Sequence, residues 1–372
     1  MKRKIIFACP WARNKQTSWS GTHMGLYNAL SKHYNLEEFD IGYANNKKDL
    51  SAMLQMYLDK FKRKLFHIQD CGYGRIKYFN RIARKKYAGK DEICFQFEEC
   101  PCCDDVKSFI YQDLHVGFYK RVIEDMPELS QVVCPNLKVN EVEKRANYQR
   151  MFYDNAEKIF TMSHWLIDEM VNNYGLPREK LIYAGGGYNV DPYLIEDNRK
   201  QGNKMLFVGR DFERKNGPLV VDAYQVAKKE FPELELYIAG PKDLNVDIAG
   251  VKLLGDLSYE ELVEYFNICD IFVMPSKFEA YGLVFAEALA FGLPCIGRNA
   301  FEMPYFIENG KTGFLLEKES PEALADLMLK LIRSEEIKNN VKVKREWYLR
   351  EYSWDAVAQR IANVMDGYFL NR

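Results

Sequence analysis

The sequence lacks the long apolar runs by which membrane proteins are recognised. No run reaches the roughly 18 residues that a membrane-spanning helix needs. The basic start, MKRKIIFACPWARN, continues with only about five apolar residues before Pro10 and Trp11, which is too short for the core of a signal peptide. We therefore expect a first buried strand here and a cytoplasmic protein.

The sequence also lacks a regular cysteine framework. Nine cysteines in irregular positions fit free thiols rather than disulfides. The cluster of Cys94, Cys100, Cys102 and Cys103 invites a zinc interpretation, but a structural zinc site usually pairs two C-x-x-C knuckles and only C-P-C-C is present. We predict no metal site.

Three nucleotide-handling motifs are missing as well. There is no G-x-x-x-x-G-K-[ST] loop, which argues against a nucleotide triphosphatase, and no G-x-G-x-x-G after a strand, which argues against a dinucleotide oxidoreductase. No D-x-D triplet is present to hold a divalent metal on a diphosphate. We therefore expect no cofactor.

The net charge of −1 conceals a basic block. Between Lys60 and Lys90 the only acid is Asp70, against eleven lysines and arginines. Such a block can attract anionic membrane lipid or a polyanionic acceptor, which would place the protein peripherally on the inner face of the membrane. The alternative is a solvated helix face. Nucleic acid is disfavoured because no recognised motif accompanies the block.

The chain is long enough for two domains, and its pattern supports two. Short β-type runs alternate with helical patterns, as in parallel sheets covered by helices. The polar stretch Asp197–Asn203 reads as a linker, after which the pattern restarts. We predict an α/β protein with two Rossmann-like doubly wound domains, 1–197 and 198–354, and a C-terminal helix at about 355–372 that packs back on the first domain.

The stretch FEAYGLVFAEALAFGLP, Phe278–Pro294, is the most informative about function. It places Glu279 before a glycine and Glu287 inside an apolar helical run. Burying such a carboxylate without a partner costs several kcal/mol, so a polar group is expected to meet Glu287. Gly282 lets a helix N-terminus come close to a ligand phosphate. The alternative is a helix with one solvent-facing glutamate.

The loops that follow other predicted strands carry matching chemistry. Gly209-Arg210 follows the strand that ends at Val208, and Lys215 lies just before a helix start at Asn216-Gly217-Pro218. Two cations at the amino end of a helix form an anion site. In the first half, Ser18, Ser20, Gly21 and Thr22 form a small polar turn that opens a helix. Together these loops suggest a diphosphate in a cleft between two domains, although Arg210 and Lys215 taken singly could be ordinary surface charge.

These residues resemble the retaining glycosyltransferases of family 4, which have the GT-B fold. The resemblance covers most of the second half, and the motifs that carry it are VGRDFERKNG, YIAGP, VKLLGDLSYEELVEYFNICDIFVMPS, the E-x7-E pair and ENGKTGFLL. In the first half it is looser, and it runs through WSGT, NAEKIFTMSHWLIDEM and AGGGYN.

The resemblance implies a role for each matching residue. Arg210 and Lys215, with Gly209, would hold the donor diphosphate. Glu279 would bind sugar hydroxyls and Glu287 the ribose diol. The backbone of Ala280, Tyr281, Gly282, Leu283 and Val284 would line the sugar and phosphates. Gly21 and Thr22 would approach the diphosphate, and the nucleobase of the donor would lie near Leu257 and Glu261.

Asp113 and His115 follow a predicted strand where family members place a polar or histidine residue by the donor sugar. His115 would contact the sugar or the acceptor, and the alternative is a loop histidine with no role.

The resemblance thus implies an enzyme that moves a sugar from a nucleotide-diphosphate sugar to a glycan, lipid-linked or small-molecule acceptor, with retention and without a metal. A nucleotide-sugar epimerase of the same fold and a non-catalytic sugar-nucleotide-binding protein are the alternatives.

Overall fold

The computed structural model describes residues 2–43, 45–46, 50–66, 73–100, 106–196, 202–241, 244 and 246–370, the side chains of 62–66 excepted. The chain divides into two compact units: unit 1 comprises Met1–Gly187 and Trp354–Arg372, and unit 2 comprises Tyr188–Ser353. The structural divisions fall at 187/188 and 353/354, against predicted ones at 197/198 and 354/355. Most of the predicted linker, 197–201, lies outside the described residues.

Unit 1 is built on a six-stranded parallel sheet with the strand order β2-β1-β3-β4-β5-β6. The order reverses between β1 and β3, where Phe7 pairs with Phe95. The strands are β1 (Lys4–Cys9), β2 (Asn35–Asp40), β3 (Glu92–Gln96), β4 (Val106–Gln112), β5 (Lys158–Thr161) and β6 (Leu181–Tyr183). Apolar side chains fill β1 and β4 on both faces, as expected for a sheet covered by helices.

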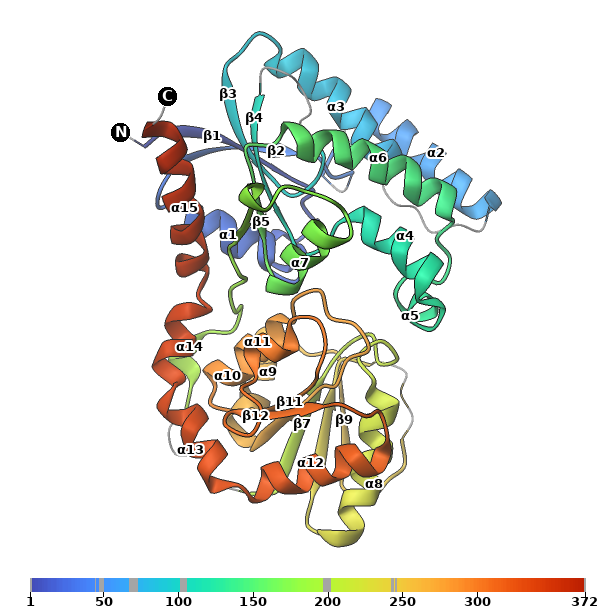
Figure 1. The fold of residues 1–372 in the computed structure, drawn as a ribbon, viewed down its shortest axis with the longest axis vertical. Coiled ribbons are helices and arrows are strands. Elements are labelled where there is room, and N and C mark those ends of the chain that lie inside the picture. Colours follow the sequence, from blue (N-terminus) through green and yellow to red (C-terminus); the bar gives the residue numbers. More distant parts are fainter. Residues whose placement is uncertain are drawn as a thin grey trace. The chain divides into compact units, whose positions relative to one another are not determined.

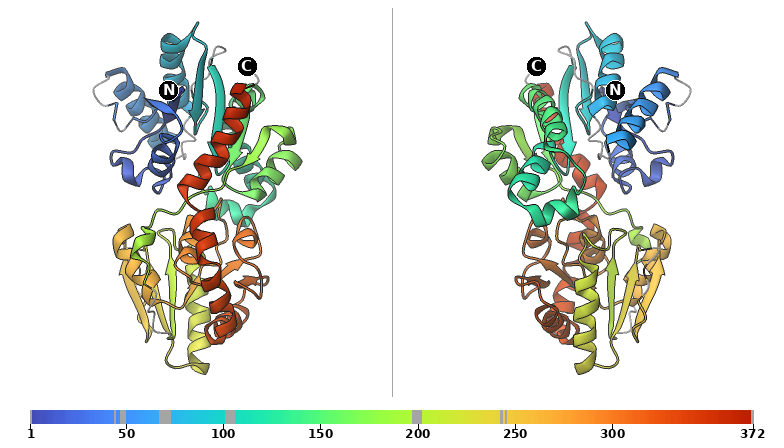
Figure 2. Two further views of the ribbon diagram at one scale, coloured as in Figure 1. Left: turned by 90° about the vertical axis from the view of Figure 1, so that its left-hand side faces the viewer. Right: turned by 90° about the vertical axis from the view of Figure 1, so that its right-hand side faces the viewer.

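Helices cover both faces of this sheet (Figures 1 and 2). They are α1 (Thr22–Leu30), α2 (Leu50–Phe66), α3 (Tyr73–Tyr87), α4 (Val116–Asp125), α5 (Pro127–Val133), α6 (Val139–Asn155), α7 (His164–Asn172) and α15 (Trp354–Leu370), with the 3-10 turns η1 (Lys15–Thr17) and η2 (Arg178–Lys180). Sequence reasoning missed α3, because its basic residues drew attention to charge. Its buried Ile76, Phe79, Ala83 and Tyr87 nevertheless recur at helical spacing.

The last helix, α15, returns to unit 1 and packs against α1. The contact depends on Gly25 of α1, because a Cβ at that position would lie 2.3 Å from the Trp354 indole nitrogen. A hydrogen bond from Tyr34 Oη to Asp366 Oδ1, 2.8 Å long, fixes the far end of the helix. The C-terminal segment is therefore part of the unit 1 core.

Unit 2 contains a second six-stranded parallel sheet with the order β12-β11-β10-β7-β8-β9. Its strands are β7 (Lys204–Val208), β8 (Glu235–Ala239), β9 (Val251–Gly255), β10 (Ile271–Val273), β11 (Cys295–Arg298) and β12 (Gly313–Leu316). Its helices are α8 (Gly217–Glu230), α9 (Tyr259–Ile268), α10 (Leu283–Ala290), α11 (Met303–Phe306), α12 (Pro321–Arg333), α13 (Glu335–Val343) and α14 (Arg345–Glu351), with the 3-10 turn η3 (Pro192–Leu194).

Two doubly wound parallel sheets confirm the predicted α/β fold class. Local signals set the helix starts of unit 2. The predicted capping box of Ser258 and Glu261 forms at the start of α9, and Ser320 caps α12.

The cysteines of the described residues are buried as free thiols, among them Cys94 and Cys100 in the unit 1 core. Cys102 and Cys103 lie outside the described residues. Within the part of the chain that the structure describes, no group of three histidine, cysteine or acidic residues is arranged to hold a metal ion, and no helix is long and apolar enough to cross a membrane.

Candidate functional site

The candidate site lies in unit 2, at the carboxyl ends of β7 and β10. These strands are neighbours, with Met205 opposite Ile271. The chain runs outward from β7 through β8 to β9 and then continues from β10 through β11 to β12 on the other side. The loops after β7 and β10 therefore diverge at the point where strand order reverses, which is where ligands bind in open α/β sheets.

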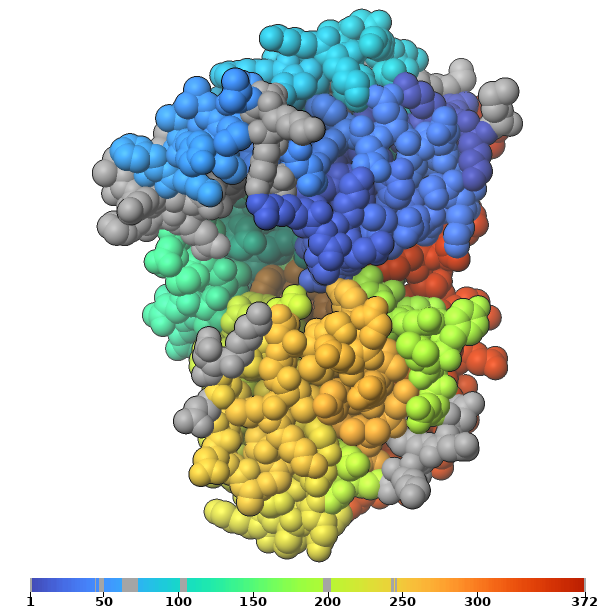
Figure 3. Space-filling view, turned by 180° about the vertical axis from the view of Figure 1, so that it is seen from behind, coloured from blue at the N-terminus to red at the C-terminus, as the bar shows by residue number. Residues whose placement is uncertain are grey.

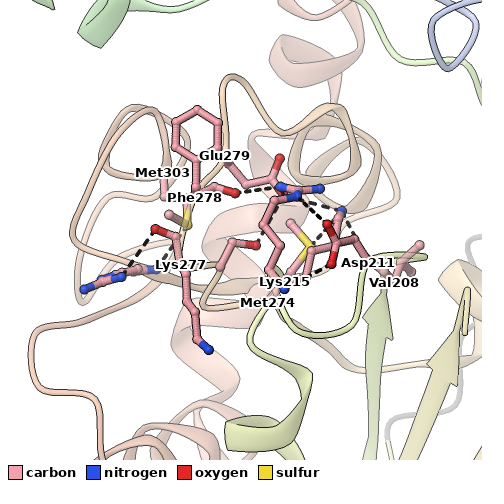
Figure 4. A network of polar contacts seen from close by, with 11 residues as sticks. Val208, Asp211, Lys215, Met274, Lys277, Phe278, Glu279 and Met303 are labelled. Atoms are coloured by element: carbon pink, nitrogen blue, oxygen red, sulfur yellow. Dashed lines mark hydrogen bonds and ion pairs between the residues drawn. The ribbon is translucent and has the colours of Figure 1, made fainter. Parts of the chain in front are cut away.

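Lys215 inserts between the ends of these two strands (Figure 4). Its ammonium donates to Val208 O at 3.3 Å and contacts Met274 Sδ at 3.3 Å, so it touches the end of β7 and the residue after β10. Only 15% of the side chain is exposed. Burial lowers the pKa of Lys215, and the facing Glu279 carboxylate opposes this shift.

Gly209 makes room for the Lys215 side chain. A Cβ at Gly209 would lie 2.2 Å from Lys215 Cδ. A Cβ at Gly240, at the end of β8, would in turn lie 2.4 Å from the Gly209 carbonyl carbon. The two glycines let the loop after β7 pack closely over the sheet edge.

Glu279 is buried and faces two cations. Its Oε1 lies 3.5 Å from Lys215 Nζ and 3.1 Å from Arg214 Nη1, and it accepts a 3.3 Å hydrogen bond from Ser276 Oγ. Arg214 also donates to Phe278 O at 2.6 Å, which ties the loop after β7 to the loop after β10 (Figure 4). Arg214 also pairs with Asp211, with 3.2 Å between Nε and Oδ2, so the compact cluster holds two cations and two carboxylates.

Two helices begin at this cluster. Asn216 caps α8 and Gly282 caps α10, both in the left-handed conformation, with φ of 60° and 101°. At the start of α10 the first N–H groups have no acceptor within the helix, the arrangement that binds anions, whereas at the start of α8 the Gly217 N–H donates to Phe212 O at 2.8 Å and Pro218 has no N–H. Helix α10 begins at Leu283, directly after Gly282 as predicted, and Ala280 and Tyr281 precede the cap. Tyr281 is buried against Phe306 at 5.1 Å between ring centroids.

Glu287 lies on the buried side of α10, with 4% of its surface exposed. Its Oε1 accepts a 3.1 Å hydrogen bond from the Asn189 backbone N–H. Burial raises the pKa of Glu287 to about 7, while that hydrogen bond and the charge of Lys215 oppose the shift. One backbone donor leaves most of the lone pairs of a buried carboxylate available to a further donor.

Arg210 stands apart from the Lys215–Glu279 cluster in this structure. Its side chain is 73% exposed and its Nε donates to Asp256 Oδ1 at 2.6 Å. The side chain that joins the cluster is Arg214, which sequence reasoning did not single out. The sequence contained a signal for Arg214, because it directly precedes Lys215 in the loop after β7. Ser276 likewise lies just before the Glu279–Glu287 motif in the loop after β10.

Leu257 and Glu261, which were predicted to lie near the nucleobase of the donor, are at the start of α9. Leu257 is half-buried, and Glu261 is exposed and closes the capping box through its Oε2 on Ser258 N at 2.8 Å. Their neighbour Tyr259, which was not predicted, lies near Glu287: burial, followed by the charge of Glu287, raises the pKa of Tyr259 to about 12.

In unit 1, the turn before α1 is strained. Trp19, Ser20 and Gly21 have φ of 47°, 53° and 86°, three successive left-handed residues of which two have side chains. Such conformations cost of order 1 kcal/mol or more each and gather at functional sites. Thr22 is buried at the start of α1. The turn follows β1, at the point where the strand order of unit 1 reverses.

His115 is the buried N-cap residue that precedes α4, and it is 1% exposed. Its Nε2 lies 3.7 Å from Glu169 Oε1, beyond hydrogen-bond distance, and neither ring nitrogen has a hydrogen-bond partner among the described residues. Burial lowers the pKa of His115, with Glu169 acting in the opposite direction. Asp113, two residues earlier, is half-buried and directly follows β4.

Comparison with known proteins gives this geometry a context. Residues 195–346 match the family described as "Glycosyl transferases group 1", a segment that contains the whole site in unit 2 except Asn189. The chain is similar to D-inositol 3-phosphate glycosyltransferase of Paenarthrobacter aurescens (24% identity; 63% of each chain) and to the amylovoran biosynthesis glycosyltransferase AmsK of Erwinia amylovora (27% identity; 52% of this chain and 51% of that one). It therefore spans less than two thirds of the length of these curated relatives.

Solved structures match the fold over the full chain. Sucrose-phosphate synthase from Thermosynechococcus elongatus superposes with a TM-score of 0.70 at 14% identity, over 100% of both chains. WaaG, a glycosyltransferase involved in lipopolysaccharide biosynthesis, gives 0.62 at 13% identity, over 97% of this chain and 99% of that one. At such identities the likeness establishes the fold alone, which is the GT-B fold expected from the sequence.

Proposed function

We propose that the protein is a retaining glycosyltransferase that takes a sugar from a nucleotide-diphosphate sugar. The observation that carries this is the cluster of Lys215, Arg214 and Glu279 at the point where the strand order of unit 2 reverses. A buried lysine at the junction of two helix N-termini is suited to a diphosphate, and the match of residues 195–346 to a glycosyltransferase family favours a sugar attached to it.

In this proposal the diphosphate takes the place beside Lys215 and the first N–H groups of α10. Arg210, with its exposed side chain, reaches the same phosphates by exchanging its contact with Asp256. Gly209 has no Cβ and therefore leaves space for the Lys215 side chain. The charge that develops on the leaving phosphate is met by these groups, so no divalent metal is required.

The two glutamates have different roles. Glu279 lies beside the cations and binds hydroxyls of the donor sugar. Glu287, with one backbone donor at Oε1, accepts hydrogen bonds from the ribose diol. The nucleobase packs near Leu257 and Glu261. Tyr259, which lies between these two residues in the sequence, also contacts it. The backbone of Ala280–Val284 lines the sugar and phosphates.

The reaction proceeds with retention at the anomeric carbon. The bond from that carbon to the diphosphate oxygen breaks, the acceptor hydroxyl oxygen forms the new bond on the same face, and its proton passes to the leaving phosphate. No protein general base is then needed. In unit 1, Gly21 and Thr22 contact the phosphates and Asp113 and His115 contact the sugar or the acceptor, which is a glycan, a lipid-linked sugar or a small molecule.

Two alternatives remain distinguishable. A nucleotide-sugar epimerase is disfavoured, since the family match and the curated relatives named above are glycosyltransferases. A non-catalytic sugar-nucleotide-binding protein would bind the donor without turnover.

A thermal-shift screen tests the proposal. The protein is heated with sugars linked to uridine, guanosine and adenosine diphosphate, and with the free diphosphates. One series should raise the melting temperature, because ligand at about 100 times its Kd adds about 2.7 kcal/mol of stability. Release of the free diphosphate when an acceptor is added identifies a transferase, whereas no response to any donor would overturn the proposal.

A further inference from the structure

Helix α2 carries an apolar face that is exposed in the described part of the structure. Among the large hydrophobic residues that are exposed in the described part of the chain, five belong to this helix, and their exposed fractions run from 45% to 83%. They are Leu50, Leu54, Tyr57, Leu58 and Phe61. Their spacing places them on one side of the helix, since residues three, four and seven apart share a face.

The opposite face of α2 is the one that packs on unit 1. Ala52 is 2% exposed and Asp59 7%. The Asp59 carboxylate accepts a 2.8 Å hydrogen bond from Tyr43 Oη and a 3.0 Å bond from Gln55 Nε2. At about 100° per residue these positions lie roughly 140–180° from Leu54 and Phe61. The exposed side chains therefore point away from unit 1 because the helix is anchored through its polar face.

Helix α2 and the helix that packs against it, α3, are basic. Asp59 is the one acid in the sequences of α2 and α3, and it is buried. Exposed cations stand on both helices, namely Lys60 on α2 and Lys77, Arg81 and Lys85 on α3. The two helices pack together and lie at the surface of unit 1 (Figures 1 and 3).

We propose that the outer face of α2 docks on an anionic lipid bilayer. The helix lies in the plane of the interface, with Leu54, Leu58 and Phe61 among the acyl chains and the cations of α2 and α3 at the headgroups. A stripe of leucine and aromatic residues bordered by cations is the pattern of interfacial amphipathic helices, and each cation near an anionic leaflet adds favourable energy. A second copy fits less well, because pairing this face with itself would bring two positive surfaces together.

Vesicle co-sedimentation of the full chain tests the proposal, with phosphatidylcholine vesicles that contain or lack phosphatidylglycerol. The first variant replaces Leu54, Leu58 and Phe61 by serine, and the second is Lys77→Gln/Arg81→Gln. Their controls are Met151→Ser, an exposed apolar residue (64%) on another helix of unit 1, and Lys229→Gln/Lys318→Gln, two exposed lysines of unit 2. Melting temperatures verify that each variant is folded.

The wild type should bind only the anionic vesicles, and more weakly at about 1 M salt than at about 0.05 M. Each α2 or α3 variant should bind at least about tenfold more weakly, while both controls bind as the wild type does. Equal binding to both kinds of vesicle, or unchanged binding of the serine variant, overturns the proposal. A wild-type dimer that the serine variant disrupts, without vesicle binding, overturns it in favour of a second copy.

Discussion

The ammonium of Lys215 lies 3.5 Å from the Glu279 carboxylate, and the two residues come from loops after different strands of the unit 2 sheet. Arg214, next to Lys215, completes the cluster at 3.1 Å from the same oxygen. Arg214 also pairs with the more exposed Asp211, so Lys215, which contacts Glu279 alone among these carboxylates, is the cation that a diphosphate can best use.

Replacing Lys215 by methionine should reduce kcat/KM by about 10²–10³, because a buried cation that meets developing charge contributes that much. Methionine keeps most of the volume against Gly209, so the fold should survive. Steady-state kinetics and the affinity for the free nucleoside diphosphate measure the effect. Lys229→Met, on the exposed side of α8, is the matched control, and equal activity of the two variants would remove Lys215 from the donor site.

Arg210→Ala should mainly weaken diphosphate binding, whereas Arg214→Ala should mainly lower the free energy of unfolding. Arg210 forms an exposed ion pair of the kind worth only about 0.2–1 kcal/mol, so its loss should weaken diphosphate binding with little change in melting temperature. Loss of Arg214 leaves Phe278 O and Glu279 short of a donor and should cost about 1–3 kcal/mol of unfolding free energy. Denaturant unfolding and calorimetric binding compare them, and a stable Arg214 variant would contradict the structural role.

Gly209→Ala should act on activity through Lys215. The added methyl group would meet Lys215 Cδ at 2.2 Å and push the ammonium out of its place between β7 and β10. In the wild-type background, Gly209→Ala should lower the donor affinity. In the Lys215→Met background it should hardly change the affinity, because displacing an uncharged methionine removes no cation from the donor site. A double-mutant cycle measures this coupling; full additivity would mean that Gly209 acts independently of Lys215. Gly367→Ala, with open space around the glycine, is the control.

Glu287→Gln should change both stability and its pH dependence. The folded-state pKa of about 7 lies above the ordinary value of 4.5, so ionising Glu287 opposes folding: the penalty is absent below about pH 4.5, grows from there to pH 7 and is fully present above. Without ligand, the glutamine variant should be more stable at pH 8 by on the order of 3 kcal/mol, and this gain should shrink as pH falls towards 4.5. Melting curves across this range measure it, and a pH-independent difference would refute the shift.

The same variant should bind donor more weakly at pH 8, since an amide oxygen is a poorer acceptor for the ribose diol than a carboxylate. For the wild type, donor affinity should decline as pH falls through 7, and for the glutamine variant it should not. Opposite effects on stability and binding are the signature expected of a buried group kept for its ligand.

Much of the fold could be predicted because the signals are local. Alternating runs of β-type and helical pattern identified the two sheets, and the capping box of Ser258 and Glu261 formed as predicted. Helix α3 was missed although its apolar spacing was present, because its six lysines and arginines were interpreted only as part of a basic block. The helices α4 and α5 were likewise not identified from sequence.

Within the site, the sequence by itself determined the chemistry of the loops: which strands end in glycine and cations, and that Glu287 sits in an apolar helix and needs a polar partner. Only the tertiary structure decided which of these groups meet. Arg214 joins Lys215 and Glu279 while Arg210 turns to Asp256, and the partner of Glu287 is the Asn189 backbone, because residues far apart in the chain come together only through the order and register of the strands.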